Sequence, residues 1–89
     1  MKVGEIWKVT REGGLAGIFY CKIVKIFYKR DKFGPDIYED YWIECKPLKK
    51  DLEKNNDHCN AIFPREIFLE CFEFFATSLN EGIKLLENK

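Results

Sequence analysis

Four cysteines and one histidine are the residues of this 89-residue chain that could ligate a metal or act in nucleophilic catalysis. The cysteines, which are Cys21, Cys45, Cys59 and Cys71, include no C-x-x-C pair of the kind that marks a zinc site. His58 and Cys59 are neighbours, and adjacent side chains of an extended segment point in opposite directions. A catalytic base must instead be aimed at its nucleophile by a third group. We therefore expect no metal and no Cys-His catalysis, and we interpret the cysteines as small buried hydrophobic residues.

Other patterns of polar residues do not indicate an enzyme either. The glycines at the start of the chain, Gly13, Gly14 and Gly17, lack the Lys-Ser/Thr pair that follows a phosphate-binding loop. Three carboxylates, Glu39, Asp40 and Glu44, could approach one another, but no second carboxylate set accompanies them for acid-base chemistry. The sequence thus predicts a non-enzymatic protein without a cofactor.

A group of aromatic residues indicates binding rather than catalysis. Its predicted anchors are Tyr20, Tyr28, Tyr38 and Trp42, with Lys22 and Lys46 as charged residues at the rim. Aromatic anchors within a polar rim are typical of protein interfaces. In one alternative, the C-terminal segment covers these residues and they belong to the core. In another, the uncovered face or strand edge joins copies of the chain into a homo-oligomer.

Nucleic acid is the alternative partner. Lys25, Lys29, Arg30 and Lys32 could grip phosphates while neighbouring aromatic rings stack on bases. Acidic residues between and beside them, such as Asp31 and Glu39, would repel a phosphate backbone. The 15 basic and 15 acidic residues also cancel, so no global field attracts nucleic acid. A protein partner is therefore favoured.

These side chains are positioned by residues 17–48, which read as one long β-hairpin. β-branched and aromatic residues dominate both arms, and Gly34-Pro35 interrupts them at the reversal. Two registers fit: one places Cys21 opposite Cys45 and Tyr28 opposite Tyr38, and the other places Phe27 opposite Ile37. Whether Cys21 and Cys45 form a disulfide is left open.

Alternation sorts the hairpin side chains into two faces. The predicted core face carries Phe19, Cys21, Ile23, Phe27, Ile37, Tyr41, Ile43 and Cys45, and the other face carries Tyr20, Val24, Ile26, Tyr28, Tyr38 and Trp42. Both faces are apolar. This pattern predicts a sheet covered on both sides, or strands so bent that their two ends bury opposite faces.

The segments outside the hairpin predict further strands of a small sheet, followed by a C-terminal part in which the apolar residues have helical spacing. We expect an edge strand at Val3–Thr10, a glycine turn at Arg11–Gly14, a second strand starting near Leu15–Gly17, and a short strand at Ala61–Phe63. A polar excursion spans residues 46–60, with one helical turn around Leu48–Leu52.

After Pro64, apolar residues follow one another at intervals of three and four residues. This spacing predicts an amphipathic helical segment over residues 64–88. A final strand over residues 68–75 is the alternative. Ser78 and Glu81 match a capping box, which predicts a break near Thr77 and a second short helix to Asn88. One continuous helix is the other possibility.

The chain length allows a single domain over residues 1–89, with the sheet in residues 3–63. Hydrophobic residues make up 46% of the chain and aromatic residues 16%, enough for a folded core. No apolar run approaches the roughly 20 residues of a membrane span. The N-terminus lacks the apolar region of a signal peptide, so we expect a cytoplasmic location with reduced cysteines.

Several short motifs resemble small SH3-like barrel proteins of bacteria and their phages. They are Val3-Gly4-Glu5-Ile6-Trp7-Lys8, the turn Glu12-Gly13-Gly14, the strand end Trp42-Ile43-Glu44-Cys45, and the passage from Ile62-Phe63-Pro64 to Phe68-Leu69-Glu70-Cys71-Phe72, so that the likeness spans residues 3 to 75. With the residue patterns above, the resemblance implies an α+β fold in which a small, strongly bent antiparallel sheet forms an SH3-like barrel with one or two C-terminal amphipathic helices. It implies no catalytic residues. By analogy with phage accessory proteins, it suggests a domain that binds and inhibits or redirects a host factor, with nucleic-acid binding as the alternative.

Overall fold

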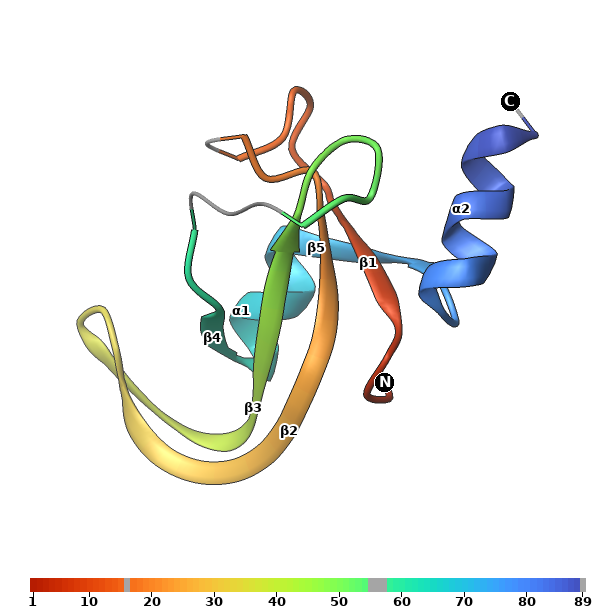
Figure 1. The fold of residues 1–89 in the computed structure, drawn as a ribbon. Coiled ribbons are helices and arrows are strands. Elements are labelled where there is room, and N and C mark those ends of the chain that lie inside the picture. Colours follow the sequence, from red (N-terminus) through yellow and green to blue (C-terminus); the bar gives the residue numbers. More distant parts are fainter. Residues whose placement is uncertain (16, 55–57, 89) are drawn as a thin grey trace.

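The computed structural model describes residues 1–15, 17–54 and 58–88, which form a small α+β protein. Its elements are β1 (Ile6–Val9), β2 (Tyr20–Phe33), β3 (Asp36–Leu48), β4 (Ala61–Pro64), α1 (Arg65–Cys71), β5 (Phe72–Ala76) and α2 (Leu79–Glu87). The strands form one antiparallel sheet in the order β4-β3-β2-β1-β5 (Figure 1). The α+β class is confirmed. The sheet is not closed into a barrel, so an SH3-like identity stays a prediction.

The long central hairpin is confirmed as β2 and β3, but both predicted registers are wrong. Ile23 pairs with Cys45 and Lys25 pairs with Glu44, so Val24 is an extra residue without a partner. Such a bulge shifts the pairing by one position and increases the local bend. It also reverses the predicted alternation in the second half of β2, where Ile26 packs against the core face.

The hairpin bends so far that its tip turns back toward β4 (Figure 1). Contacts agree with this view, because the Phe33 ring near the tip lies 5.9 Å from the ring of Phe63 on β4. Trp42 and Ile43 are consecutive residues of one strand, and both are buried. Since consecutive side chains point to opposite faces, both faces of β3 are buried at this point, in agreement with the predicted strong bend of the strands.

The first strand is not an edge strand, contrary to prediction. Lys8 pairs with Tyr20 of β2 on one side and with Glu73 of β5 on the other. The predicted glycine turn before β2 is confirmed, and Gly13 and Gly14 have φ values of +80° and +78°. The strand that follows begins at Tyr20, later than expected.

The helix that begins after Pro64 is confirmed but ends at Cys71. The prediction of helix beyond that point is wrong for β5, where the strand alternative is right. Pairing with the open edge of β1 satisfies the backbone groups of β5 that face β1, and Phe72 and Ala76 of β5 are buried. The pairing of β5 with β1 therefore decides its structure, although the spacing of apolar residues in this segment favours a helix.

The second helix and its capping box are confirmed. The Ser78 Oγ accepts a hydrogen bond from the Glu81 backbone N–H at 3.2 Å, and the Glu81 carboxylate accepts from the backbone N–H and hydroxyl of Thr77. In place of the predicted helical turn around Leu48–Leu52, Leu52 adopts a φ of +69° and buries its side chain. Residues 55–57 of the predicted polar excursion lie outside the described residues.

Two groups of buried side chains hold these elements together. The first lies between the sheet and α1 and contains Val9, Cys21, Ile23, Ile43, Cys45, Phe68 and Phe72. The second fastens α2 through Ile6, Tyr20, Leu48, Leu52 and Ala76. In the described part of the chain, no helix is long and apolar enough to cross a bilayer.

Candidate functional site

The four aromatic anchors do not share one exposed face, so this prediction is wrong. Tyr20 is only 5% exposed, and its ring centroid lies 4.9 Å from that of Phe75 in the second core group. Trp42 is 3% exposed. Tyr38 is half-buried, whereas Tyr28 is 59% exposed. The bulge places Tyr20 and Tyr28 on opposite faces, and the bend then buries the face that carries Trp42.

The predicted rim lysines lie away from the exposed tyrosine. Lys22 and Lys46 are directly opposite each other on β2 and β3, and both are partly buried. Lys22 precedes Tyr28 by six residues on β2, and the bulge at Val24 leaves the two side chains on opposite faces. The structure therefore does not assemble these two lysines into a rim around Tyr28.

The exposed aromatic residues of the hairpin are Tyr28 and Tyr41, which form a direct cross-strand pair. Their ring centroids are 5.4 Å apart with an interplanar angle of 82°, an edge-to-face contact. Tyr41 is 52% exposed. Edge-to-face geometry is favourable for aromatic pairs, so the two rings form a defined feature of the surface.

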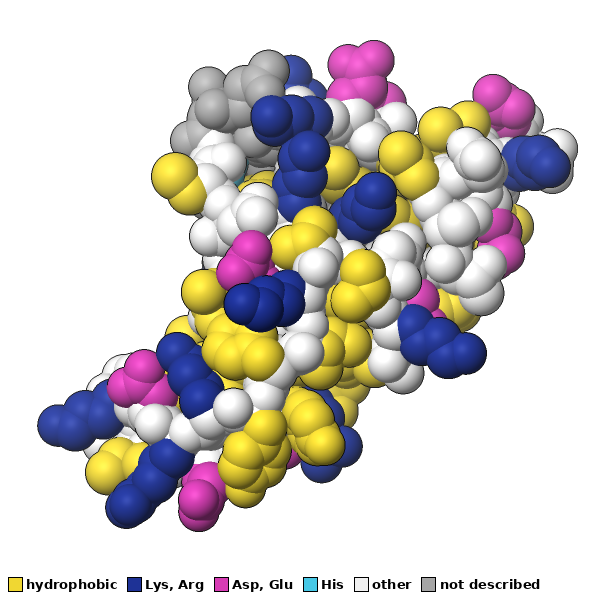
Figure 2. Space-filling view, turned by 60° about the horizontal axis from the view of Figure 1, so that its bottom comes forward, with side chains coloured by type: hydrophobic (Ala, Val, Ile, Leu, Met, Phe, Trp, Pro, Cys, Tyr) yellow, Lys and Arg dark blue, Asp and Glu magenta, His cyan; other side chains and the backbone are white. Residues whose placement is uncertain are grey.

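Further residues continue this surface toward the hairpin tip. Because alternate residues share a face, Arg30 and Lys32 of β2 lie beside Tyr28, and Ile37 and Glu39 of β3 lie beside Tyr41. All of them are exposed. We call the set the outer hairpin face: Tyr28, Arg30, Lys32, Ile37, Glu39 and Tyr41. Figure 2 shows hydrophobic side chains among basic and acidic ones where the hairpin comes forward.

Next to this face lies a shallow hollow of about 290 Å³. Its lining includes Met1, Ile26, Tyr41 and Arg65. Arg65 forms an ion pair with Asp40, with 3.6 Å between the guanidinium Nε and the carboxylate Oδ2. The hollow extends the apolar surface from the two tyrosine rings toward the N-terminus.

The opposite, inner face of the bend is occupied by contacts within the protein. The Lys29 Nζ lies 4.4 Å from the centroid of the Trp42 ring and 3.1 Å from Oδ2 of Asp31. Hydrogen bonding to Lys29 lowers the pKa of the Asp31 carboxyl below its ordinary value. Desolvation, together with the charges of Asp36 and two glutamates of α1, raises the pKa of Tyr38. Tyr38 therefore lies in an acidic environment near α1.

The four cations of the nucleic-acid alternative do not form one stripe. Lys25 and Lys29 are on the inner face, and Arg30 and Lys32 are on the outer hairpin face. Three of them stand opposite a carboxylate, in the pairs Lys25 with Glu44, Lys29 with Asp40, and Arg30 with Glu39. This arrangement weakens the attraction of the hairpin for a phosphate backbone.

The cysteines give no metal centre in the described part of the chain, where no group of three or more His, Cys, Asp or Glu side chains could hold an ion. Cys21 and Cys45 are free thiols buried in the first core group. They lie diagonally rather than opposite each other. A hydrogen bond between the two thiols, together with burial, raises the pKa of Cys21 far above its ordinary value.

Sequence reasoning missed Tyr41 as a surface residue. Tyr41 shares the strand face of Ile43, which is part of the core, so alternation assigned both residues to the interior. The pairing of β4 with β3 stops at Trp42, however, so Tyr41 has no partner on β4 and is exposed. The predicted strand at Ala61–Phe63 is short, and this was the one sign in the sequence that it could pair with only a few residues of the hairpin.

Comparison of the chain with protein-family models, curated proteins and solved structures gave no match. The resemblance to SH3-like barrel proteins of bacteria and phages therefore stays a prediction.

Proposed function

We propose that this chain is a non-enzymatic binding domain that docks a protein partner on its outer hairpin face. The observation that carries the proposal is the exposed, mutually packed pair Tyr28 and Tyr41. Tyrosine and arginine are enriched at protein interfaces because they combine a large contact area with a polar group. Here two tyrosines, Arg30 and the exposed Ile37 occupy one strand face.

The charges of the face indicate the chemistry of the partner. Arg30 and Lys32 stand beside one carboxylate, Glu39, so the face has a small positive excess. A complementary partner has an apolar depression for the two rings and carboxylates at its edge. Charges at the rim of an interface mainly set the association rate and the specificity, while the buried rings contribute most of the affinity.

A nucleic-acid partner has less support. The basic residues are divided between two faces of the hairpin, and Glu39 faces Arg30 directly. A strand of nucleic acid that stacked on Tyr28 would bring its phosphates near this carboxylate. The protein partner therefore remains the better proposal.

The test is affinity capture from a lysate of the source cell or its host, with and without nuclease and at two salt concentrations. Three tagged baits are compared: the unchanged chain, the double variant Tyr28→Ser/Tyr41→Ser, and Leu85→Ser. Leu85 is an exposed apolar residue of α2, which lies far from the tip of the hairpin (Figure 1), and it serves as the matched control.

A protein captured by the unchanged chain and by Leu85→Ser, but lost with the double variant, supports the proposal. Capture that is equal for all three baits contradicts it. Loss of all captured material on nuclease treatment would transfer the function to nucleic acid. Sedimentation of the purified chain completes the test, because a dimer that dissociates only in the double variant identifies a second copy as the partner.

A further inference from the structure

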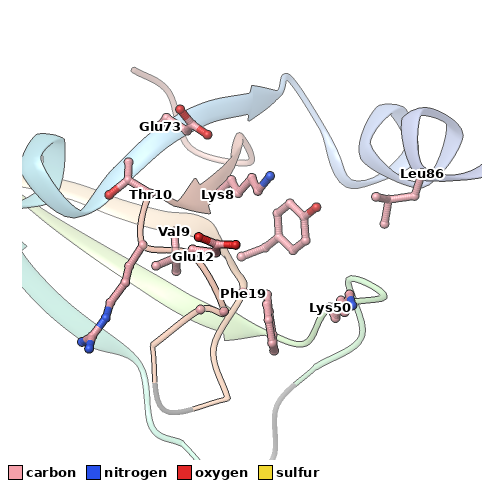
Figure 3. Close-up of a pocket in the computed structure, with 12 residues that line it drawn as sticks. Lys8, Val9, Thr10, Glu12, Phe19, Lys50, Glu73 and Leu86 are labelled. Carbon is pink, nitrogen blue, oxygen red and sulfur yellow. The ribbon is translucent and has the colours of Figure 1, made fainter. Parts of the chain in front are cut away.

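A larger hollow of about 520 Å³ lies away from the hairpin bend, where several segments meet (Figure 3). Its walls come from the end of β1 and the turn that follows, the start of β2, the loop after β3, one residue of β5 and one of α2. Its volume falls within the range of about 300 to 1,000 Å³ that is typical of pockets for small molecules. Sequence reasoning did not predict it, because the segments are distant along the chain.

Three cations line this hollow: Lys8, Arg11 and Lys50. Each of them is exposed, and none forms an ion pair with another described residue. Two carboxylates, Glu12 and Glu73, also line it and make no ion pair within the described residues. The hollow thus holds three cations and two carboxylates, a positive excess of one charge, and Glu73 stands directly opposite Lys8 on the neighbouring strand.

The apolar part of the wall is formed by two half-buried side chains, one of which packs closely on the glycine turn. Phe19 immediately precedes β2 and Leu86 belongs to α2, and both are half-buried. The turn approaches Phe19 so closely that a Cβ added at Gly14 would lie 3.0 Å from its ring and 2.7 Å from the Ile18 carbonyl oxygen. Only glycine fits there, so the backbone of the turn packs directly on the ring.

Tyr20 adds a hydrogen-bond donor beside this apolar wall. Its ring is fixed against Phe75, and the residue lines the hollow. Its hydroxyl makes no hydrogen bond to another described residue. Burial raises the pKa of Tyr20, so the hydroxyl keeps its proton and can donate it in a hydrogen bond.

We propose that this hollow binds a small organic anion that carries an apolar ring. The ring lies against Phe19 and Leu86, and a carboxylate, sulfonate or phosphate accepts hydrogen bonds from Lys8, Lys50 and the Tyr20 hydroxyl. Figure 3 shows Lys8, Lys50 and Leu86 approaching the hollow from three different segments. The site is separate from the outer hairpin face, and the inference does not depend on the proposed function.

The probe is 8-anilinonaphthalene-1-sulfonate, which combines aromatic rings with one sulfonate and fluoresces when bound. The unchanged chain should show saturable binding at one site. Exposed ion pairs are weak one by one, so the loss of both ammonium groups in Lys8→Gln/Lys50→Gln should weaken binding by about 10-fold. Glu12→Gln should strengthen it by about 2- to 4-fold, because it removes a charge that repels the sulfonate.

Two control variants locate the probe. Lys22→Gln removes a lysine outside the hollow, and Tyr28→Ser/Tyr41→Ser removes the exposed aromatic pair of the hairpin. Both should bind the probe as the unchanged chain does, and circular dichroism verifies that every variant is folded. Absence of saturable binding, unchanged affinity in the double lysine variant, or loss of binding in the hairpin variant would each overturn the proposal.

Discussion

The indole N–H of Trp42 donates a hydrogen bond to the backbone carbonyl oxygen of Lys29, 3.1 Å away on the facing strand. The ammonium group of the same lysine lies 4.4 Å from the centre of the indole ring. This relationship makes Trp42 part of the interior and ties together the two arms of the hairpin where they bend. These contacts hold together the two strands whose opposite side carries Tyr28 and Tyr41, the exposed pair of the outer hairpin face.

Removal of the Trp42 ring should destabilise the whole domain. We expect Trp42→Ala to lower the free energy of unfolding by about 3 to 5 kcal/mol, because it empties a buried site and leaves the Lys29 carbonyl without its donor. Trp42→Phe should cost less. Urea denaturation measures both, with Ile37→Ala as an exposed control that changes stability by less than about 0.5 kcal/mol. Native stability in Trp42→Ala would contradict the buried position of Trp42.

The two glycines of the first turn should differ in their tolerance of alanine. Both have positive φ, so either substitution strains the backbone by about 1 to 2 kcal/mol. At Gly14 the added Cβ would also collide with the Ile18 carbonyl oxygen, whereas the space at Gly13 is open. Thermal unfolding should therefore show a clearly larger loss for Gly14→Ala than for Gly13→Ala. Equal losses would argue against the close approach at Gly14.

The cap of α2 should contribute measurably to stability. Ser78→Ala removes the acceptor for the Glu81 backbone N–H and should cost about 1 kcal/mol, while Ser78→Asp keeps an acceptor and should restore most of it. Chemical denaturation gives the stability, and hydrogen exchange of the amides in α2 locates the effect. If Ser78→Ala and Ser78→Asp are equally stable, the cap does not contribute as the structure indicates.

The cysteines should react in order of their exposure. A thiol reagent should modify the exposed Cys59 first and the partly buried Cys71 more slowly, because burial raises the pKa of Cys71 and keeps its thiol protonated. Cys21 and Cys45 should react only after unfolding. Rapid modification of all four thiols in the folded protein would contradict the buried positions of these two.

The raised pKa of Cys21 also predicts a pH dependence of stability. In the unfolded chain the thiol loses its proton above about pH 8.5, whereas in the folded protein it stays protonated. The unfolded state is therefore favoured as the pH rises above this value, and the free energy of unfolding should fall. Cys21→Ala should show a weaker decline in urea titrations between neutral and alkaline pH. An equal decline in both proteins would assign the effect to other groups.

Features set by local chemistry could be predicted from the sequence. The reversal at Gly34-Pro35, the glycine turn before β2, the helix start after Pro64 and the capping box at Ser78 each depend on residues within a few positions. All four were found where the sequence placed them.

Features set by distant contacts could not be predicted in this way. Val24 is a good strand residue with nothing to mark it as a bulge, yet it changes the register and the face of every later residue of β2. β5 has a helical period and becomes a strand because β1, more than 60 residues earlier, offers it an open edge. The candidate site also depends on distant contacts, since Tyr41 is exposed just beyond Trp42, the last residue of β3 that pairs with β4.

Protein binding by the outer hairpin face is tested most directly by calorimetry on folded proteins. The experiment compares the affinity of the captured partner for the unchanged chain and for Tyr28→Ser/Tyr41→Ser. Loss of two interface anchors of about 1 to 2 kcal/mol each predicts a dissociation constant that rises by about 30-fold or more in the double variant, with no change in Leu85→Ser. Equal affinity of the unchanged chain and the double variant would contradict a protein-binding role for the outer hairpin face.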